Sequence, residues 1–378
     1  MATSLYPVLG LLKDDAVTEI EVNAWNHIYA KGTAWRGHRL MEGLSWPSPE
    51  SLKTACATIT EYSSRIVNEN KPVFDGRLPG GERVNIAFPP FCEKVSITIR
   101  KFPAETMTLE RLLEYESIDS DIREMLETLV LVRKNILVSG GTNSGKTSLL
   151  NALSRVIPEN QRVVTVEDSR ELQIIQANWV ALETVQAYRS DMTEVSIAMG
   201  VKNTLRMTPD RIIVGECRDE SAFFMLRANS TGHSGGLSTV HADSGADALD
   251  QIQLLAQFGV SAGVSEKAVA KLVSRAVDVV VQVKQFEEDD SRKLVEIIEM
   301  ERPGLRYEDG AAHYRYRTLL RYDADRIIGA DGEPKIVGAW VYPQCPSPRL
   351  CNLITFKGHK WPAASLMAPD EEEFAYVG

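Results

Sequence analysis

Short apolar runs alternate with helical stretches through the central part of the chain. The runs are NILVSG (135–140), RVVTVE (162–167), RIIVGE (211–216) and GLSTVH (236–241). Each run has the length of a buried strand, and each ends in small, acidic or imidazole side chains. This alternation predicts a mostly parallel sheet with helices on both faces, in an α/β domain over residues 109–300.

The first hundred residues follow a different pattern. Residues 51–67 place apolar side chains near helical spacing, and KVSITIR (94–100) alternates apolar and polar positions as a half-buried strand does. The stretch KFPAETMT (101–108) carries a proline and few apolar anchors. We therefore predict an N-terminal α+β domain over residues 1–103 and a hinge at 104–108.

The last part of the chain changes character again. HYRYRTLLRY (313–322) predicts a strand, YPQCPSPRL (342–350) a proline-rich loop, and PDEEEFAYVG (369–378) an acidic end. We treat residues 301–378 as a C-terminal extension of unknown role. It either docks a partner or completes the preceding domain, and the sequence leaves both alternatives open.

Composition narrows the class of protein. Hydrophobic residues make up 44% and charged residues 25%, which is typical of a globular chain. The sequence contains no run of about 18 apolar residues of the kind that spans a membrane. The first residues, MATSLYPVLGLLKDD, lack the pattern of a signal peptide. Five scattered cysteines without a CxxC pair suit a reducing compartment. We expect a cytoplasmic protein.

Net charge bears on nucleic-acid binding. The formal net charge is -10, whereas non-specific nucleic-acid affinity comes from neutralising many phosphates. We therefore expect no direct nucleic-acid binding.

A glycine-rich segment follows the first apolar run. GGTNSGKT (140–147) fits the pattern GxxxxGK[ST] between a predicted strand and a predicted helix. Backbone N–H groups and the helix N-terminus would bind phosphate, Lys146 would reach the outer phosphates, and Thr147 would offer its hydroxyl to Mg²⁺. Asn143 stands where glycine is often found and tolerates positive φ. The predicted nucleotide-binding residues are Gly140, Gly141, Thr142, Asn143, Ser144, Gly145, Lys146, Thr147 and Ser148.

Acidic side chains end two of the later runs. Glu167 and Asp168 end the run in VTVEDSREL, and Glu216 precedes Arg218 and Asp219 in GECRDE. A carboxylate at such a strand end orients an attacking water or holds Mg²⁺ through a water. Taken singly, each is also compatible with a solvated loop charge.

Two histidines flank the fourth run, in TGHSGGLSTVHAD (231–243). His241 follows the strand, at the edge expected to carry the phosphate loop, where an imidazole can sense a terminal phosphate. His233 opens the preceding glycine loop, and for it a structural role is as good an interpretation.

Taken in order, four segments resemble known boxes. GGTNSGKT, VTVEDSREL, LRMTPDRIIVGECRDE and TGHSGGLSTVHADS resemble the Walker A, aspartate, Walker B and histidine boxes of the type II and type IV secretion ATPase superfamily, over about residues 70–285. KNTLRMTPDRIIVGE is most similar to the traffic ATPases of type IV secretion and conjugation. The resemblance implies a RecA-like P-loop NTPase domain at 109–300 that uses ATP and Mg²⁺.

The resemblance also implies roles for single residues. Glu216 would be the base or water-orienting residue, and Glu167 would support the metal and its waters. His241 would read the terminal phosphate. The metal ligands would be Thr147, Glu167 and Glu216, while Arg206 and Arg218 are candidates for contacts within or between subunits.

The likeness extends into the first domain. FDGRLPGGERVNIAFPP (74–90) and SITIRKFP (96–103) are similar to arginine-bearing segments of the family. By that likeness Arg77, Arg83 and Arg100 would be catalytic and would bring positive charge to the phosphates, for which the guanidinium fork is suited. The alternative is that each is a surface arginine on a strand or turn.

The function implied is that of an ATP-hydrolysing motor of a bacterial type IV secretion or conjugation system, driving substrate export or pilus biogenesis. The resemblance further implies a homo-hexamer that associates peripherally with inner-membrane components of the machine. The alternatives are a type II secretion or type IV pilus assembly ATPase, a RecA-like or helicase-like nucleic-acid motor, and a nucleotide switch without meaningful turnover.

Overall fold

The computed structural model describes residues 5–62, 67–102, 106–185, 194–260, 264–308, 311–329 and 332–362. The chain divides into two compact units, Met1–Glu105 and Thr106–Gly378. Part of the predicted hinge at 104–108 lies outside the described residues.

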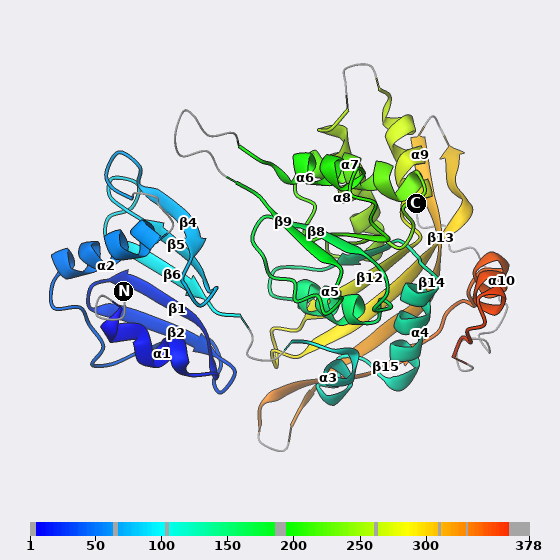
Figure 1. The fold of residues 1–378 in the computed structure, drawn as a ribbon. Coiled ribbons are helices and arrows are strands. Elements are labelled where there is room, and N and C mark those ends of the chain that lie inside the picture. The colour runs from blue at the N-terminus through cyan, green and yellow to red at the C-terminus, as the bar shows by residue number, and fades with distance from the viewer. Residues whose placement is uncertain are drawn as a thin grey trace. The chain divides into compact units, whose positions relative to one another are not determined.

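The first unit is a six-stranded antiparallel sheet with short helices against it (Figure 1). The strand order is β3-β2-β1-β6-β5-β4. The strands are β1 (Val17–Ala24), β2 (His27–Gly32), β3 (His38–Leu40), β4 (Val73–Arg77), β5 (Arg83–Ala87) and β6 (Ser96–Arg100), and the helices are η1 (Tyr6–Val8), α1 (Leu9–Lys13) and α2 (Pro49–Tyr62).

Apolar spacing explains the core of this unit. Helix α2 buries Leu52, Cys56 and Ile59, which lie three or four residues apart and so share one face. Strand β6 buries Ile97 and Ile99, two residues apart. The predicted strand is confirmed as β6, and the predicted helix at 51–67 is confirmed as α2 but ends at Tyr62; residues 63–66 lie outside the described residues, and Val67 is not helical.

The second unit is built on a nine-stranded mixed sheet in the order β15-β14-β13-β12-β7-β11-β10-β8-β9. From β12 to β9 in this order, neighbouring strands are parallel, and β12 to β15 are antiparallel. The bounds are β7 (Ile136–Ser139), β8 (Val163–Glu167), β9 (Trp179–Glu183), β10 (Arg211–Val214), β11 (Leu237–Val240), β12 (Val279–Gln285), β13 (Arg292–Glu308), β14 (Ala311–Ile328) and β15 (Pro334–Val341). The mostly parallel sheet predicted from the four apolar runs is confirmed.

Helices cover both faces of this sheet (Figure 1). Along β7, Ile136 and Val138 belong to one hydrophobic cluster and Leu137 to the other, because successive side chains of a strand point to opposite faces. The first cluster includes side chains of α3 (Leu109–Glu114), α4 (Ser120–Leu131), α5 (Lys146–Arg155) and α10 (Pro348–Phe356). The second includes those of α6 (Ile197–Thr204), α7 (Ser221–Ser230), α8 (Gly245–Gln257) and α9 (Glu266–Ala276).

The C-terminal extension expected from residue 301 onward is not separate from the preceding domain. Strand β13 crosses residue 300, and β14 and β15 add to the same sheet by antiparallel pairing. Of the two alternatives, the described part of residues 301–378 therefore completes the domain. The predicted proline-rich loop ends earlier than expected, because Ser347 caps α10 by accepting a hydrogen bond from the Leu350 N–H. The acidic end at 369–378 lies outside the described residues.

No helix in the described ranges is both long enough and apolar enough to cross a bilayer.

Candidate functional site

Four neighbouring strand ends carry the residues singled out from the sequence. In the sheet the order is β7-β11-β10-β8, and all four strands are parallel. Their carboxyl ends therefore lie along one edge, where ligands of open α/β sheets bind. The loop 140–145 follows β7, His241 follows β11, Glu216 comes two residues after β10, and Glu167 ends β8.

The loop after β7 has the backbone of an anion cradle. Asn143 has φ 60 and Gly145 has φ 96, so the expected positive φ at Asn143 is confirmed. A Cβ on Gly140 would collide with the Val283 carbonyl oxygen of β12, which explains why only glycine fits there. Helix α5 starts directly after Gly145, and no side chain of the described residues caps it. Its first-turn N–H groups are thus available to an anion.

Lys146 extends back over this loop. Its Nζ donates to the carbonyl oxygens of Gly140 at 2.9 Å and Gly141 at 2.7 Å, and lies 3.2 Å from His241 Nδ1. Burial lowers the pKa of Lys146 to about 8, against the opposite effect of the nearby Glu216 carboxylate. An oxyanion placed in the loop would compete with these neutral acceptors for the ammonium.

His241 joins the lysine to the acidic end of β10. Because an ammonium only donates, His241 Nδ1 accepts from Lys146, and the other ring nitrogen, Nε2, donates to Glu216 Oε1 at 3.0 Å. Burial first, and the Lys146 charge next, lower the pKa of His241. The imidazole is therefore neutral at neutral pH and has a defined tautomer.

Arg218 extends the same chain of contacts to β8. Its Nε donates to Glu216 Oε2 at 2.7 Å, and its Nη1 lies 3.2 Å from Asp168 Oδ2. Asp168 Oδ1 in turn accepts from the Thr184 hydroxyl at 2.9 Å. Both oxygens of Glu216 are thus held, one by an imidazole and one by a guanidinium, which defines the orientation of the carboxylate.

Glu167 combines one anchored and one unpartnered oxygen. Oε1 accepts from the backbone N–H groups of Glu171 at 2.7 Å and Leu172 at 2.9 Å. Oε2 is buried without a hydrogen-bond partner among the described residues. Burial raises the pKa of Glu167 to about 6, although the two N–H donors oppose this.

These features fit a magnesium-bound nucleotide better than a preformed metal centre. In the described part of the chain, no group of three or more His, Cys, Asp or Glu side chains is arranged to hold a metal. Mg²⁺ in nucleotide sites usually keeps several waters and takes one or two carboxylates together with substrate phosphates. The unpartnered oxygen of Glu167 suits such a bound water.

Space for a ligand group lies beside this network. A pocket of about 350 Å³ is lined by Glu216, Arg218 and His241, with Cys217, Val240, Gln251 and Leu255 completing its wall. The carboxylate and the imidazole therefore face a cavity and not packed protein.

Comparison with known proteins identifies the family of this chain. The family model described as Type II/IV secretion system protein matches residues 46–312, which is more than half of the chain. The chain belongs to this family. The resemblance found in the sequence is confirmed.

Individual relatives show which members of the family this chain is similar to. The type IV secretion system protein VirB11 of Bartonella quintana is 31% identical over 75% of this chain and 89% of its own. The conjugal transfer protein TrbB of Rhizobium radiobacter is 30% identical over 84% of this chain and 92% of its own. The X-ray structure of the Legionella pneumophila ATPase DotB shares the fold with a TM-score of 0.56 at 20% identity, covering 78% of this chain and 80% of that one. These two curated relatives are thus a type IV secretion protein and a conjugal transfer protein.

The three arginines predicted in the first unit form one row. Arg77 of β4 is paired with Arg83 of β5, and Arg83 with Arg100 of β6. Residues directly opposite in antiparallel strands project from the same face, so the three side chains share one end of the sheet. Arg77 Nη1 donates to the Gly81 carbonyl at 3.0 Å, and Arg100 Nε lies 3.8 Å from Glu19 Oε1. The sequence placed these arginines in two segments but did not predict that they are direct neighbours.

Other residues of the sequence prediction lie apart from the network. Arg206 follows α6 at the surface. His233 precedes β11 and so lies at the opposite edge of the sheet from His241. Asp219 accepts from the Ser221 N–H at 2.8 Å, at the start of α7. Thr147 and Ser148 lie in the first turn of α5, next to Lys146.

Sequence reasoning missed Arg292. This first residue of β13 donates from Nε to the Asn143 carbonyl at 2.9 Å, and its Cδ lies 3.6 Å from where a Cβ on Gly145 would be. The contact spans 149 residues. No local pattern marks Arg292, because it reaches the phosphate loop only through the pairing of β13 with β12 next to β7.

Proposed function

We propose that this protein hydrolyses ATP, with Mg²⁺, and works as a motor of a bacterial type IV secretion or conjugation system. The observation that carries the proposal is the unbroken chain of contacts from Lys146 through His241 and Glu216 to Arg218, along the edge that carries the phosphate loop. Membership of the secretion family and the names of the relatives support the same conclusion.

The loop and the start of α5 would bind the phosphates of the substrate ATP. Backbone N–H groups of residues 140–148 present partial positive charge, and Lys146 adds a full one. Thr147 would hold Mg²⁺ directly, and Glu167 would orient one of its waters through Oε2. The metal would supply charge neutralisation at the phosphates.

Glu216 would orient the attacking water. Its carboxylate faces the pocket, and its neighbours His241 and Arg218 keep it from rotating. When Lys146 turns towards a phosphate, His241 Nδ1 loses its donor, so the His241–Glu216 pair senses whether the loop is filled.

The arginine row of the first unit would complete the site. We propose that Arg77, Arg83 and Arg100 bring positive charge to the phosphates of their own or a neighbouring subunit, which would couple hydrolysis to movement of one unit against the other. Arg218 contacts Glu216 and Asp168 within its own subunit, whereas the exposed Arg206 remains a candidate for a contact within or between subunits.

The assembly would be a homo-hexamer on the cytoplasmic side, attached to inner-membrane components of the secretion machine. These proposals rest on the family and on the names of the relatives. The names of the relatives favour type IV secretion and conjugation over the pilus and type II alternatives.

The test is Glu216→Gln in a phosphate-release assay, with nucleotide affinity measured in parallel. Turnover is expected to fall by about 10²-fold or more, because the water-orienting charge is lost, while affinity changes little. Glu124→Gln, at an exposed position of α4, makes the same chemical change outside the site and should keep wild-type turnover. Unchanged turnover in Glu216→Gln would refute the proposed role.

A further inference from the structure

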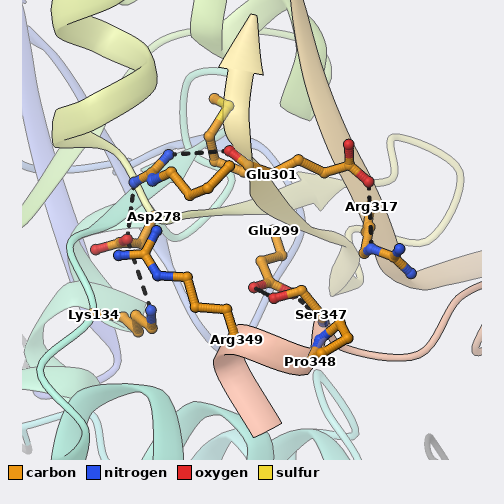
Figure 2. A pocket seen from close by; sticks show the side chains of 10 residues that line it. Lys134, Asp278, Glu299, Glu301, Arg317, Ser347, Pro348 and Arg349 are labelled. Carbon is orange, nitrogen blue, oxygen red and sulfur yellow. Dashed lines mark hydrogen bonds and ion pairs between the residues drawn. The ribbon is translucent and has the colours of Figure 1, made fainter. Parts of the chain in front are cut away.

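A second charged pocket lies at the edge of the sheet opposite the phosphate loop. It measures about 220 Å³. Lys134 and Asp278 come directly before β7 and β12, whereas the phosphate loop follows β7. Residues 299–302 of β13, Arg317 of β14 and the start of α10 form the remaining wall (Figure 2). Arg317 and the start of α10 lie beyond the part of the chain that the family model matches.

The acidic side chains of this pocket are already engaged. Glu299 accepts from both the N–H and the hydroxyl of Ser347, at 2.8 and 2.5 Å, and so serves the start of α10. Glu301 pairs with Arg315 at 2.8 Å and Arg317 at 3.4 Å. Glu299 keeps its negative charge, because both of its Ser347 donors are neutral, so Asp278 and Glu299 both oppose the other cations of the pocket.

Three cations face these two carboxylates. Arg302 Nη2 lies 3.0 Å from Asp278 Oδ1, and Lys134 Nζ lies 3.8 Å from the same oxygen. Arg349 extends from the start of α10 towards Asp278 (Figure 2), yet its side chain forms no ion pair or hydrogen bond within the described residues. Against Asp278 and Glu299, these three cations leave one positive charge unbalanced, in a chain whose formal net charge is -10.

Lys134 adds the observation that points to a ligand. Its side chain is only 8% exposed, and it lines the pocket. At 3.8 Å the Asp278 oxygen is beyond hydrogen-bond reach, so the ammonium has three donors and no acceptor among the described residues. The ammonium therefore faces the cavity with unused donors, for which a ligand oxygen would be the acceptor.

Arg302 contributes positive charge to the pocket, but its N–H donors are already used. Its guanidinium donates to the carbonyl oxygens of Ser274, Arg275 and Val277 at the end of α9. Burial lowers the pKa of Arg302, Asp278 opposes this, and the like charge of Arg349 lowers the pKa further. The two guanidinium groups therefore repel each other, and an anion between them and Lys134 would relieve that repulsion.

We propose that this pocket binds a phosphate group, held by Arg349 and Lys134 and attracted by the charge of Arg302. The guanidinium fork matches two phosphate oxygens, and the lysine ammonium binds a third as a point charge. The volume admits one phosphate with part of its substituent. The start of α10 is capped by Ser347, so the side chains, and not the helix terminus, supply the attraction.

The test is calorimetric titration of the full-length protein with inorganic phosphate, with its loop at 140–148 first saturated by a non-hydrolysable ATP analogue and Mg²⁺. We expect binding that weakens about tenfold or more in Arg349→Ala and is lost in Arg349→Glu. Lys134→Met should weaken it as well. Arg326→Ala, which removes an exposed arginine of β14 outside the pocket, is the matched control and should bind as wild type does.

Two further experiments complete the test. One identifies the source of the phosphate, and the other distinguishes this pocket from the nucleotide-binding loop. Phosphatidylcholine vesicles with and without phosphatidic acid identify a lipid headgroup: Arg349-dependent binding to phosphatidic acid alone would support the pocket and assign it to lipid. Lys146→Ala should lose nucleotide binding but keep phosphate binding at the pocket. The two proposals can therefore fail independently of each other. Binding to neither probe, or binding that survives Arg349→Glu, would overturn the proposal.

Discussion

At the scale of single residues, the environment of Lys146 determines how the phosphate loop responds to pH. The ammonium is held by two carbonyl oxygens and an imidazole, and burial lowers its pKa to about 8. A bound triphosphate would favour the charged form and raise that pKa. Binding above pH 8 must therefore take up a proton.

The affinity for nucleotide should thus be nearly constant below about pH 7 and fall as the pH rises through 8, approaching a tenfold loss per pH unit. Equilibrium binding of a fluorescent ATP analogue between pH 6.5 and about 9.5 measures this. Lys146→Arg, whose charge persists throughout, should bind more weakly at neutral pH but show no such decline. A flat wild-type profile would mean that Lys146 does not contact the phosphates.

At the scale of secondary-structure elements, the antiparallel extension of the sheet supports the phosphate loop. Strand β13 pairs with β12, which pairs with β7, and this places Arg292 against Asn143. Asn143 has a positive φ, a conformation that its neighbours must hold in place. The guanidinium bond to its carbonyl oxygen is one such restraint.

Arg292→Ala should weaken nucleotide binding by roughly tenfold, since a hydrogen bond from a charged donor contributes about 1.5–3 kcal/mol. Isothermal titration with ADP measures the change. Arg292→Lys keeps the charge but not the guanidinium fork, so its nucleotide affinity is expected to lie between those of the wild type and Arg292→Ala. Lys284→Ala, on the neighbouring strand β12 and exposed, is the control; an equal loss there would point to a general charge effect.

At the scale of the whole molecule, two units with separate hydrophobic cores carry different parts of the proposed site. The clusters of the first unit include no residue of the second. The phosphate loop and the network around Glu216 belong to the second unit, and the row of Arg77, Arg83 and Arg100 to the first. Under the proposed function, binding and turnover should therefore be separable.

Arg83→Ala, at the middle of the row, should retain nucleotide binding and lose turnover by about 10³-fold, as expected for an arginine that stabilises transferring phosphate. Arg39→Ala on β3 of the same unit should leave turnover unchanged. Phosphate release from mixtures of Arg83→Ala and Glu216→Gln subunits identifies the donor: recovered activity means that the arginine acts on a neighbouring subunit. Full activity of Arg83→Ala alone would exclude this arginine.

How far the sequence predicted the site depends on the distance between partners along the chain. Glu167, Glu216 and His241 were placed at one edge because each follows a recognisable apolar run. The bond between His241 and Lys146, 95 residues apart, and the contact of Arg292 were not predictable in the same way. The boundary expected at residue 300 was also misplaced, since β13 continues through it and the change of pattern there marks antiparallel strands added to the same sheet, not a separate segment.

The sequence by itself determined the phosphate loop, the parallel part of the sheet and the edge that carries the chemistry, because glycine spacing and apolar periodicity act over a few residues. Only the tertiary structure decided the order β7-β11-β10-β8, the row of three arginines and the placement of Lys134 and Arg349 in one pocket. Strand order and side-chain contact depend on which distant segments pack together. That choice is made by burial of the whole core and not by any local pattern.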